Sequence, residues 1–442
     1  MIRAGQNLEL TIDRVGPDGA GIASFEGGEV VVSGSFVGER VRVVVDHVGQ
    51  HGRSFATSEA LLTAHPGRRS PPCDRHPGRG GACSGCAWQS LHEDAQRAEK
   101  RRLLAQVYDL EVDSVRALPG GDFGYRWSSK RVVGGVAGAL VLGSYVSGSH
   151  RLADMTGCLV EHPAIAAAAH ELLAVADGLG VEPYRPVAEG SDPAASAGLR
   201  YVWLKTDGRS VLLTLITGAA DARAVRLLAE RLELPSGVAW SVQGGAGNAI
   251  RGVAIELLRG ESSLSLRLAG SEVEVGPLGF LQPNPAVAEL AYRDLVRGHD
   301  GASLAGELAL DLYAGAGVTT SLLRAGFARV VPVESYPESA HALGVVALGT
   351  AEFLAGYKGA RPKLVIANPP RAGLGAEVCE RLVSLAAPRL QIMSCSPRTL
   401  ARDLAALEAG GYRRAALRAY DTLPQTPHVE VIAWLERASA AP

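Results

Sequence analysis

The chain has 442 residues, of which 47% are hydrophobic and 20% are charged, a balance that is typical of globular proteins and excludes a disordered chain. This length allows two or three domains, each with its own hydrophobic core. The formal net charge of −2 excludes a global electrostatic attraction to nucleic acid, so any such contact has to come from local basic patches.

Clusters of Lys and Arg that could form such patches occur at four places. They are Arg68, Arg69, Arg75 and Arg79; Arg97, Lys100, Arg101 and Arg102; Arg126, Lys130 and Arg131; and Arg413 with Arg414. The sequence has no apolar run of roughly 18 residues and no signal-peptide core at its N-terminus. We therefore expect a cytoplasmic protein without a membrane partner, in which reducing conditions disfavour structural disulfides.

Residues 1–62 are predicted to form a small β-barrel. Short alternating runs separated by Gly/Asp turns predict strands at 8–12, 21–25, 30–32 and 40–45. Strands of this length that close on themselves make an oligonucleotide-binding or SH3-like barrel. Aromatic residues are sparse, so contact with a nucleic-acid backbone is expected to outweigh base stacking. A barrel that serves only folding or dimerisation is the alternative.

A linker rich in Pro, Gly and Arg, residues 64–72, precedes a group of cysteines. Cys73, Cys83 and Cys86 form a C-x9-C-x2-C arrangement, and Cys158 lies further along the chain. Three clustered thiols and a remote one can surround a single centre once the chain folds. Four thiolates suit either a [4Fe–4S] cluster or a tetrahedral zinc ion, and the spacing does not separate the two.

The central region, residues 63–270, is predicted to be an α+β domain. A polar amphipathic helix is expected at 91–108. Alternating patterns then predict strands at 132–133, 140–142, 200–204, 210–215, 237–242 and 249–258, and helices at 163–179 and 219–231. This order favours a largely antiparallel sheet.

The C-terminal region, residues 271–442, alternates strands and helices. Strands are predicted near Leu308, Val330, Lys363 and Arg389, and this order predicts a mostly parallel sheet covered on both faces. Ligands of such sheets bind at the carboxyl ends of the strands. The residues that fall there are Gly315, Glu334, Asn368 and Cys395.

The segment DLYAGAG, residues 311–317, runs from a predicted strand into a glycine-rich turn and a helix at 319–325. Such a turn lets the backbone approach a nucleotide-like ligand. The next strand ends at Glu334, whose carboxylate can accept hydrogen bonds from both ribose hydroxyls of an adenosine. The turn lacks a Lys-Ser/Thr pair, which argues against a triphosphate and favours a methionine-linked adenosine.

Two further segments supply a nucleophile and a base. Cys395 lies on a loop after an apolar strand, and Glu430 lies at the start of another strand. A thiolate that adds to an electron-poor carbon, with a carboxylate that later removes a proton, is the minimum equipment for alkylating a pyrimidine at C5. The alternative is a buried cysteine that only packs, the role we expect for Cys379. Asp421 and His428 are expected to position the Glu430 segment.

The segments DLYAGAG, ANPPRAGL, MSCSPRTLARDL and QTPHVE together resemble the RNA (uracil-5-)-methyltransferase family, which uses S-adenosylmethionine. The likeness covers nearly the whole chain in the family's order. It implies a Rossmann-like methyltransferase domain over residues 271–442, with Cys395 and Glu430 as catalytic residues. The residues expected to contact the cofactor, from the turn and from the resemblance, are Gln282, Tyr313, Gly315, Gly317, Glu334 and Asn368.

The N-terminal half adds to this resemblance. Residues 1–62 resemble the TRAM domain of RNA-modifying enzymes, and CSGCAWQ resembles the family's Cys-Gly-Gly-Cys followed by Gln. This likeness favours a [4Fe–4S] cluster, with zinc as the alternative, although the first gap of nine residues is longer than the five common in the family. A barrel and a cysteine cluster together resemble 23S ribosomal RNA enzymes more than transfer RNA enzymes. The expected partner is RNA, not DNA, and the expected state is a monomer.

Two departures from the family pattern concern the base and the cofactor. The family usually has Asp where this chain has Asn368, whose amide can pair with uracil or, flipped, with cytosine. The segment after Glu334 is shorter than usual and has Thr350 where an acidic residue would contact adenine. Uracil is the first expectation and cytosine the alternative. Two rival functions are a catalytically weakened RNA-binding assembly factor and an amino-group methyltransferase of the Asn-Pro-Pro-aromatic type, although Arg371 is not aromatic.

Overall fold

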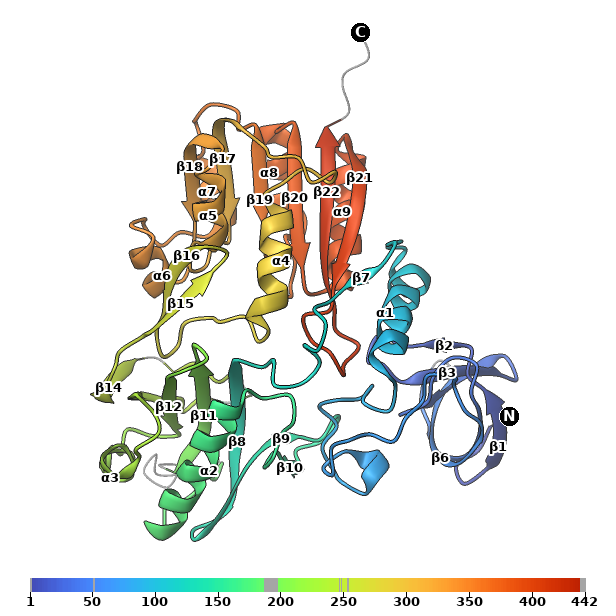
Figure 1. Ribbon diagram of the computed structural model, residues 1–442. Coiled ribbons are helices and arrows are strands. Elements are labelled where there is room, and N and C mark those ends of the chain that lie inside the picture. Colours follow the sequence, from blue (N-terminus) through green and yellow to red (C-terminus); the bar gives the residue numbers. More distant parts are fainter. Residues whose placement is uncertain are drawn as a thin grey trace.

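The protein's structure, a computed structural model, describes residues 2–437 except 51, 187–197, 246, 248 and 253. These described residues form three large sheets and one two-stranded hairpin, arranged in chain order from the N-terminal to the C-terminal part (Figure 1). Among them, no helix has the length and the apolar character that crossing a membrane requires.

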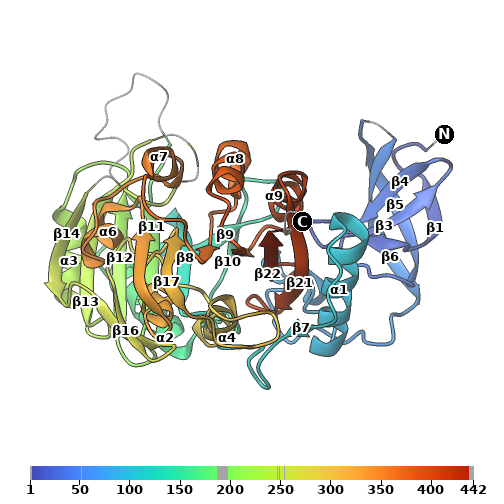
Figure 2. The same cartoon turned by 90° about the horizontal axis from the view of Figure 1, so that it is seen from above.

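The N-terminal sheet has six strands in the order β1-β5-β6-β4-β3-β2. The strands are β1 (Asn7–Thr11), β2 (Arg14–Val15), β3 (Gly21–Phe25), β4 (Gly28–Val32), β5 (Arg40–Val48) and β6 (Arg53–Thr63). The sheet curls around its own apolar core (Figure 2). In the described residues no hydrogen-bonded pairing joins β1 to β2, so the closed barrel stays a prediction.

A seven-stranded sheet with the order β10-β9-β8-β11-β12-β13-β14 forms the central part. Its strands are β8 (Ser128–Val136), β9 (Ala139–Tyr145), β10 (Leu152–Asp154), β11 (Leu199–Thr206), β12 (Val211–Thr217), β13 (Gly237–Val242) and β14 (Ile255–Gly260). The helices α2 (Pro163–Gly178) and α3 (Arg223–Arg231) share its apolar core. Every pairing except β12 with β13 is antiparallel, which confirms the predicted α+β character.

The C-terminal sheet has the order β18-β17-β19-β20-β22-β21-β7. Its strands are β7 (Val115–Arg116), β17 (Gly306–Leu312), β18 (Phe327–Val333), β19 (Leu364–Ala367), β20 (Arg389–Ser394), β21 (Tyr412–Tyr420) and β22 (Glu430–Arg437). The four strands from β18 to β20 in this order are parallel, and β22 and β21 are antiparallel to their predecessors. The edge strand β7 comes from the N-terminal half of the chain.

Two layers cover this sheet. One layer consists of four helices that share an apolar core with the sheet: α1 (Glu93–Tyr108), α7 (Thr350–Gly356), α8 (Gly375–Leu385) and α9 (Pro397–Ala409). The other contains α4 (Pro285–Leu295), α5 (Val318–Leu323) and the hairpin of β15 (Leu264–Leu268) with β16 (Ser271–Val275). The view from above shows α7, α8 and α9 on one side of the strands and α4 on the other (Figure 2). The remaining helical elements are α6 (Pro337–Ala342) and a 3-10 turn at Pro77–Arg79.

Local signals explain where the helices near the C-terminal sheet begin. The side chain of Ser396 accepts a hydrogen bond from the Thr399 N–H at the start of α9, where Pro397 occupies the first turn. The side chain of Asn284 accepts one from the Val287 N–H at the start of α4. Capping side chains and proline at the first helical position are favoured because the first N–H groups of a helix lack intrahelical partners.

The predicted elements shift at some boundaries. The helix predicted at 319–325 spans Val318–Leu323, and the strand predicted at 249–258 begins only at Ile255. The predicted division into 1–62, 63–270 and 271–442 is kept as a proposal, although β7 adds part of the middle segment to the C-terminal sheet.

Candidate active site

The carboxyl ends of the parallel strands open into one cavity of about 530 Å³. Residues from the ends of β17, β18, β19 and β20 line it together with the start of β22. The predicted residues that line it are Gln282, Tyr313, Gly315, Glu334, Asn368, Cys395 and Glu430. Gly317 is not part of this lining. It caps α5 with a left-handed φ of 80°, and a Cβ there would collide with the Leu343 side chain.

The glycine-rich turn and Glu334 are joined directly. The Gly315 N–H donates to one carboxylate oxygen of Glu334 at 2.8 Å, and the Tyr336 N–H donates to the other at 2.7 Å. These bonds orient the Glu334 carboxylate along the cavity wall. Below the turn, buried Asp311 accepts hydrogen bonds from the hydroxyls of Thr319 and Thr320, and burial raises its pKa to about 6.

Cys395 sits between a strand and a capped helix. It directly follows β20, and Ser396 caps α9 immediately after it. Ser394 pairs with Val431 on the antiparallel strand β22. This register places Cys395 beside Glu430, because Cys395 follows Ser394 and Glu430 precedes Val431 on the antiparallel strand.

Burial dominates the electrostatics of the pair. It raises the pKa of Glu430 to about 8, and the nearby guanidinium of Arg371 opposes this shift. Burial also raises the pKa of the Cys395 thiol, and the Glu430 carboxylate adds to the effect. Arg371 acts in the other direction, by its charge and by a hydrogen bond to the thiol. Desolvation and neighbouring cations lower the pKa of His428 to about 4, although the residue is exposed at the surface.

Sequence reasoning assigned no role in this site to Arg371, Arg251 or Tyr336, which also line the cavity. Arg371 directly follows Asn368-Pro369-Pro370, so its place in that segment was the available signal. Arg251 lies on the loop before β14 in the central part, and its guanidinium lies 4.4 Å from the ring centroid of Tyr336. No local sequence pattern relates these two positions.

The four predicted metal ligands come together elsewhere. Cys73, Cys83, Cys86 and Cys158 line one small cavity. Burial raises the pKa of the Cys86 thiol to about 12, and the other three thiols add to this shift. Among the described residues, no group of three or more His, Cys, Asp or Glu side chains is arranged to hold a metal ion. The fold nevertheless brings the four cysteines to one cavity.

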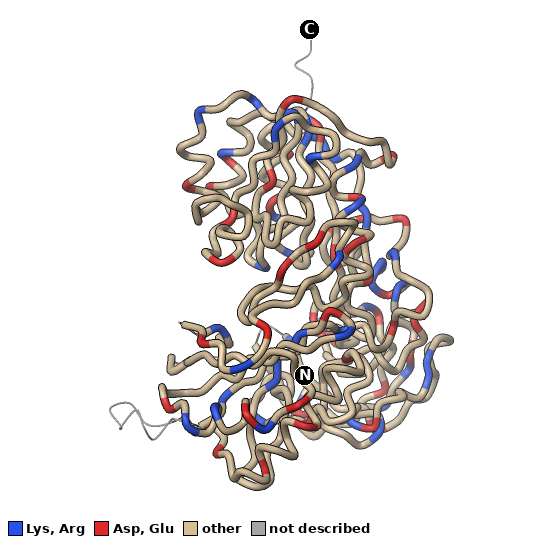
Figure 3. Tube along the Cα trace, turned by 60° about the vertical axis from the view of Figure 1, so that its left-hand side comes forward, with Lys and Arg blue, Asp and Glu red and all other residues tan. Residues whose placement is uncertain are grey.

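Ion pairs neutralise most of the predicted basic patches. Lys and Arg are interspersed with Asp and Glu over the whole trace (Figure 3). The patch residues that are paired with a carboxylate are Arg68, Arg69, Arg75, Arg79, Arg97, Lys100, Arg102, Arg131, Arg413 and Arg414. Within the part of the chain that the structure describes, Arg101, Arg126 and Lys130 form no ion pair. The Lys130 ammonium instead lies 4.0 Å from the ring centroid of Trp203.

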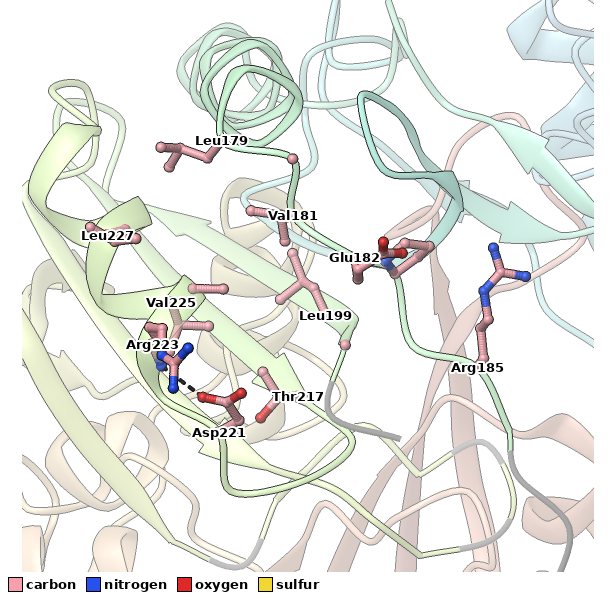
Figure 4. Close-up of a pocket in the computed structure, with 14 residues that line it drawn as sticks. Leu179, Val181, Glu182, Arg185, Leu199, Thr217, Asp221, Arg223, Val225 and Leu227 are labelled. Atoms are coloured by element: carbon pink, nitrogen blue, oxygen red, sulfur yellow. Dashed lines mark hydrogen bonds between the residues drawn. The ribbon is translucent and has the colours of Figure 1, made fainter. Parts of the chain in front are cut away.

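A separate cavity of about 510 Å³ lies in the central part, between the end of α2 and the start of α3 (Figure 4). Apolar side chains such as Val181, Leu199 and Val225 line it together with Arg185 and Asp221 (Figure 4). None of the predicted site residues lines this cavity.

Comparison with known sequences shows relatives along the whole chain. Residues 357–438 match the family model described as tRNA (uracil-5-)-methyltransferase. An uncharacterized RNA methyltransferase of Geobacter sulfurreducens is 31% identical, over 98% of this chain and 90% of the relative. A second one, from Thermosynechococcus vestitus, is 30% identical over 98% of each chain.

Among solved structures, the chain is similar to the tRNA (uracil-54, C5)-methyltransferase of Pyrococcus abyssi, determined in complex with S-adenosyl-L-homocysteine. The TM-score is 0.73, and the match covers 97% of this chain and 99% of the other. At 23% sequence identity, this likeness establishes a common fold.

Proposed function

The chain belongs to the RNA (uracil-5-)-methyltransferase family, and from this premise we propose that it transfers the methyl group of S-adenosylmethionine to C5 of a uridine in RNA. One observation carries the proposal: Cys395 and Glu430 lie side by side in the cavity that also contains the glycine turn and Glu334. A nucleophile, a base and an adenosine-binding carboxylate are the parts that this chemistry requires.

The proposed mechanism uses the chain's residues in order. The Cys395 thiolate adds to C6 of the pyrimidine, which makes C5 nucleophilic. S-adenosylmethionine, when bound, would supply the electrophilic methyl group that C5 accepts and would leave as S-adenosylhomocysteine. Glu430 then removes the C5 proton, and the electron pair of that bond re-forms the C5–C6 double bond and expels the Cys395 sulfur. Arg371 supports the first step because it favours the thiolate. A stacked base cannot present C6, so the target nucleotide has to be unpaired or flipped out.

The surroundings of the cavity support the cofactor assignment. The Glu334 carboxylate is oriented by two backbone N–H groups and can accept hydrogen bonds from the ribose hydroxyls. Gln282, Tyr313 and Asn368 line the same cavity as Glu334. The Asn368 amide keeps cytosine as the second candidate base, because a flipped amide matches its hydrogen-bonding edge.

We predict that Glu334→Gln weakens the binding of S-adenosyl-L-homocysteine by about 10- to 100-fold, since hydrogen bonds to a charged group contribute about 1.5–3 kcal/mol. Isothermal titration calorimetry measures the change. The matched control is Glu377→Gln, an exposed acid on α8 that does not line the cavity. Equal affinities of Glu334→Gln and wild type would remove Glu334 from the ribose site.

The proposed RNA substrate is 23S ribosomal RNA, with transfer RNA as the alternative that the Pyrococcus abyssi relative favours. Arg101, Arg126 and Lys130, which form no ion pair in the described residues, are the proposed phosphate contacts. The N-terminal sheet is proposed to act as a TRAM-like module that adds backbone contacts. The proposal includes a monomer located in the cytoplasm.

The test is methylation of purified 23S ribosomal RNA and of transfer RNA with labelled S-adenosylmethionine, followed by mass spectrometry of the nucleosides. The expected product is 5-methyluridine in ribosomal RNA. Because each rival leaves a different product, 5-methylcytidine would identify cytosine as the base, and an N-methylated nucleoside would indicate an amino-group methyltransferase. Binding of RNA without any methylated product would favour an assembly factor.

The four cysteines are proposed to hold a [4Fe–4S] cluster that serves as a structural clip, since C5 methylation requires no electron transfer. Two observations support this proposal: the four thiols line one small cavity, and CSGCAWQ resembles the cysteine motif of the family. Four thiolates also suit a zinc ion, which stays the alternative.

We predict that wild-type protein is brown and that Cys158→Ala loses both the visible absorbance and thermal stability, because one thiolate ligand is missing. Absorption spectra and melting curves measure the two effects. In the control Cys379→Ala, the removed thiol is buried in the core of the C-terminal sheet, so the colour should remain. Colourless wild-type protein with stoichiometric zinc would refute the iron assignment.

A further inference from the structure

The loop between β21 and β22, residues 421–429, leads directly to Glu430 and is held by the N-terminal half of the chain. Gln425 is its centre, fully buried and with a left-handed φ of 69°. Its N–H donates to the Gln96 side chain at 2.8 Å, and its carbonyl accepts from the Trp88 N–H at 3.0 Å. Its side-chain oxygen accepts from Gln96 at 2.8 Å and from Arg69 at 3.1 Å.

Further contacts hold the first half of the same loop. Buried Lys100 of α1 forms an ion pair with Asp421 at 2.5 Å and donates to the carbonyl of Leu423 at 3.1 Å. The hydroxyl of Tyr125 donates to the carbonyl of Pro424 at 2.9 Å. These partners precede the loop by about 300 residues of sequence, so the fold brings distant segments together at this place.

The N-terminal sheet reaches the same loop through Gly19. The Gly19 carbonyl accepts a hydrogen bond from the indole N–H of Trp88 at 2.9 Å. A Cβ on Gly19 would lie 2.7 Å from that indole nitrogen and 2.9 Å from the Pro427 side chain, and the residue has a φ of 84°. Glycine is therefore required for this close approach, which places the sheet against the residue before His428.

The position of Glu430 depends on this loop together with its pairing to Tyr420 on β21. Its carboxylate is buried, and no hydrogen bond to it is found among the described residues. A base has to lie within hydrogen-bond reach of the proton that it removes. Since no described side chain hydrogen-bonds to the carboxylate, the direction of the Glu430 side chain depends on the Glu430 backbone. That backbone follows directly from the loop that Gln425 fixes.

We propose that Gln425 is a positioning residue for the proton-abstraction step. Hydrogen bonds from Gln96, Trp88 and Arg69 fix Gln425, and the loop fixed in this way keeps the Glu430 carboxylate within reach of the C5 proton. The N-terminal half of the chain thereby sets the rate of the last chemical step, in addition to any contact with RNA. This inference rests on the proposed function and deepens it, because it assigns a role in one step to residues outside the cavity.

The test replaces Gln96 by leucine, which removes both of its hydrogen bonds to Gln425. The control is Gln391→Leu, an equally buried glutamine in the middle of β20 that does not contact the loop. The substrate is RNA with either hydrogen or deuterium at uridine C5, and the readouts are kcat, the KM for cofactor, the deuterium isotope effect on kcat and the covalent enzyme–RNA adduct on denaturing gels.

We expect Gln96→Leu to lower kcat by about 10- to 100-fold, the scale of a misplaced catalytic group, with the KM for cofactor unchanged. The isotope effect should rise and the adduct should accumulate, because removal of the C5 proton becomes rate-limiting. Gln391→Leu should retain the wild-type isotope effect. Arg69 is partly exposed and donates to the same side-chain oxygen of Gln425. Arg69→Met should therefore also lower kcat and raise the isotope effect, but by a smaller factor. This variant tests the inference if Gln96→Leu does not fold.

Two results would overturn the inference: a wild-type rate in both variants, or a slower rate without a larger isotope effect and without adduct. Neither result would contradict the proposed function, provided that the wild-type protein makes 5-methyluridine. Absence of any methylated pyrimidine from the wild-type reaction would remove the proposed function itself.

Discussion

Replacing Cys395 by alanine is expected to abolish methylation while leaving cofactor binding nearly intact. Without the sulfur, C6 stays unsaturated and C5 does not become nucleophilic, so the loss should be at least about 10³-fold, on the scale of removing a covalent nucleophile. The cofactor should still bind, because Glu334 and the glycine turn lie on other strands and do not depend on the thiol.

Two measurements check this expectation: the rate of transfer of a labelled methyl group to RNA, and calorimetric binding of S-adenosyl-L-homocysteine. Cys379→Ala is the matched control, since it removes a thiol that is buried in the core on α8, and it should retain activity. Substantial turnover by Cys395→Ala would show that the chemistry does not pass through a sulfur adduct.

Replacing Glu430 by glutamine is expected to trap a covalent enzyme–RNA adduct. The thiol can still add and C5 can still take the methyl group, but no base removes the C5 proton, so the sulfur is not expelled. Turnover should fall by about 10²- to 10⁴-fold, the usual contribution of a general base. A band of enzyme joined to labelled RNA on a denaturing gel measures the trapped species, and it should be absent from Cys395→Ala.

The pH dependence of the wild-type enzyme follows from the same pair. Glu430 acts as a base only when it is ionised, and burial raises its pKa to about 8. The thiol also has to lose its proton, and its pKa is raised as well. Deprotonation of either group favours the reaction, and both deprotonations become more complete as the pH rises. We therefore expect kcat to rise from about pH 7 to about pH 9.

The Glu430→Gln variant adds a second pH observation. Removing the carboxylate charge lowers the pKa of the Cys395 thiol, because that charge disfavours the thiolate. Adduct formation by the variant should therefore reach its maximum at a lower pH than wild-type turnover. Normal turnover by this variant at any pH would show that another group takes the proton.

Strand order explains which parts of the site could be predicted from the sequence. Gly315, Glu334 and Cys395 each follow a strand of a parallel sheet, and parallel strands present their carboxyl ends at one edge. The position of Glu430 needed different information, because it begins the antiparallel strand β22, and its approach to Cys395 depends on the register of that strand with β20.

Charge pairing and loop geometry were beyond the reach of local patterns. Lys100 was predicted in a basic patch, but it is buried against Asp421, which lies 321 residues further along the chain. The strand predicted at 249–258 begins later, and the preceding loop brings Arg251 to the cavity. In both cases the contact partner comes from a distant segment of the chain. Periodicity and spacing in the local sequence therefore could not predict these contacts.

The edge strand β7 completes the C-terminal sheet, although it comes from an early part of the chain. Val115 and Arg116 pair with Ala419 and Tyr420, so a fragment starting at residue 271 would expose β21 as a bare edge, and bare edges recruit strands from other molecules. A ribosome makes the N-terminal part of a chain first. The segment that pairs with this edge is therefore already synthesised when β21 leaves the ribosome, so the edge can be covered as soon as the sheet forms.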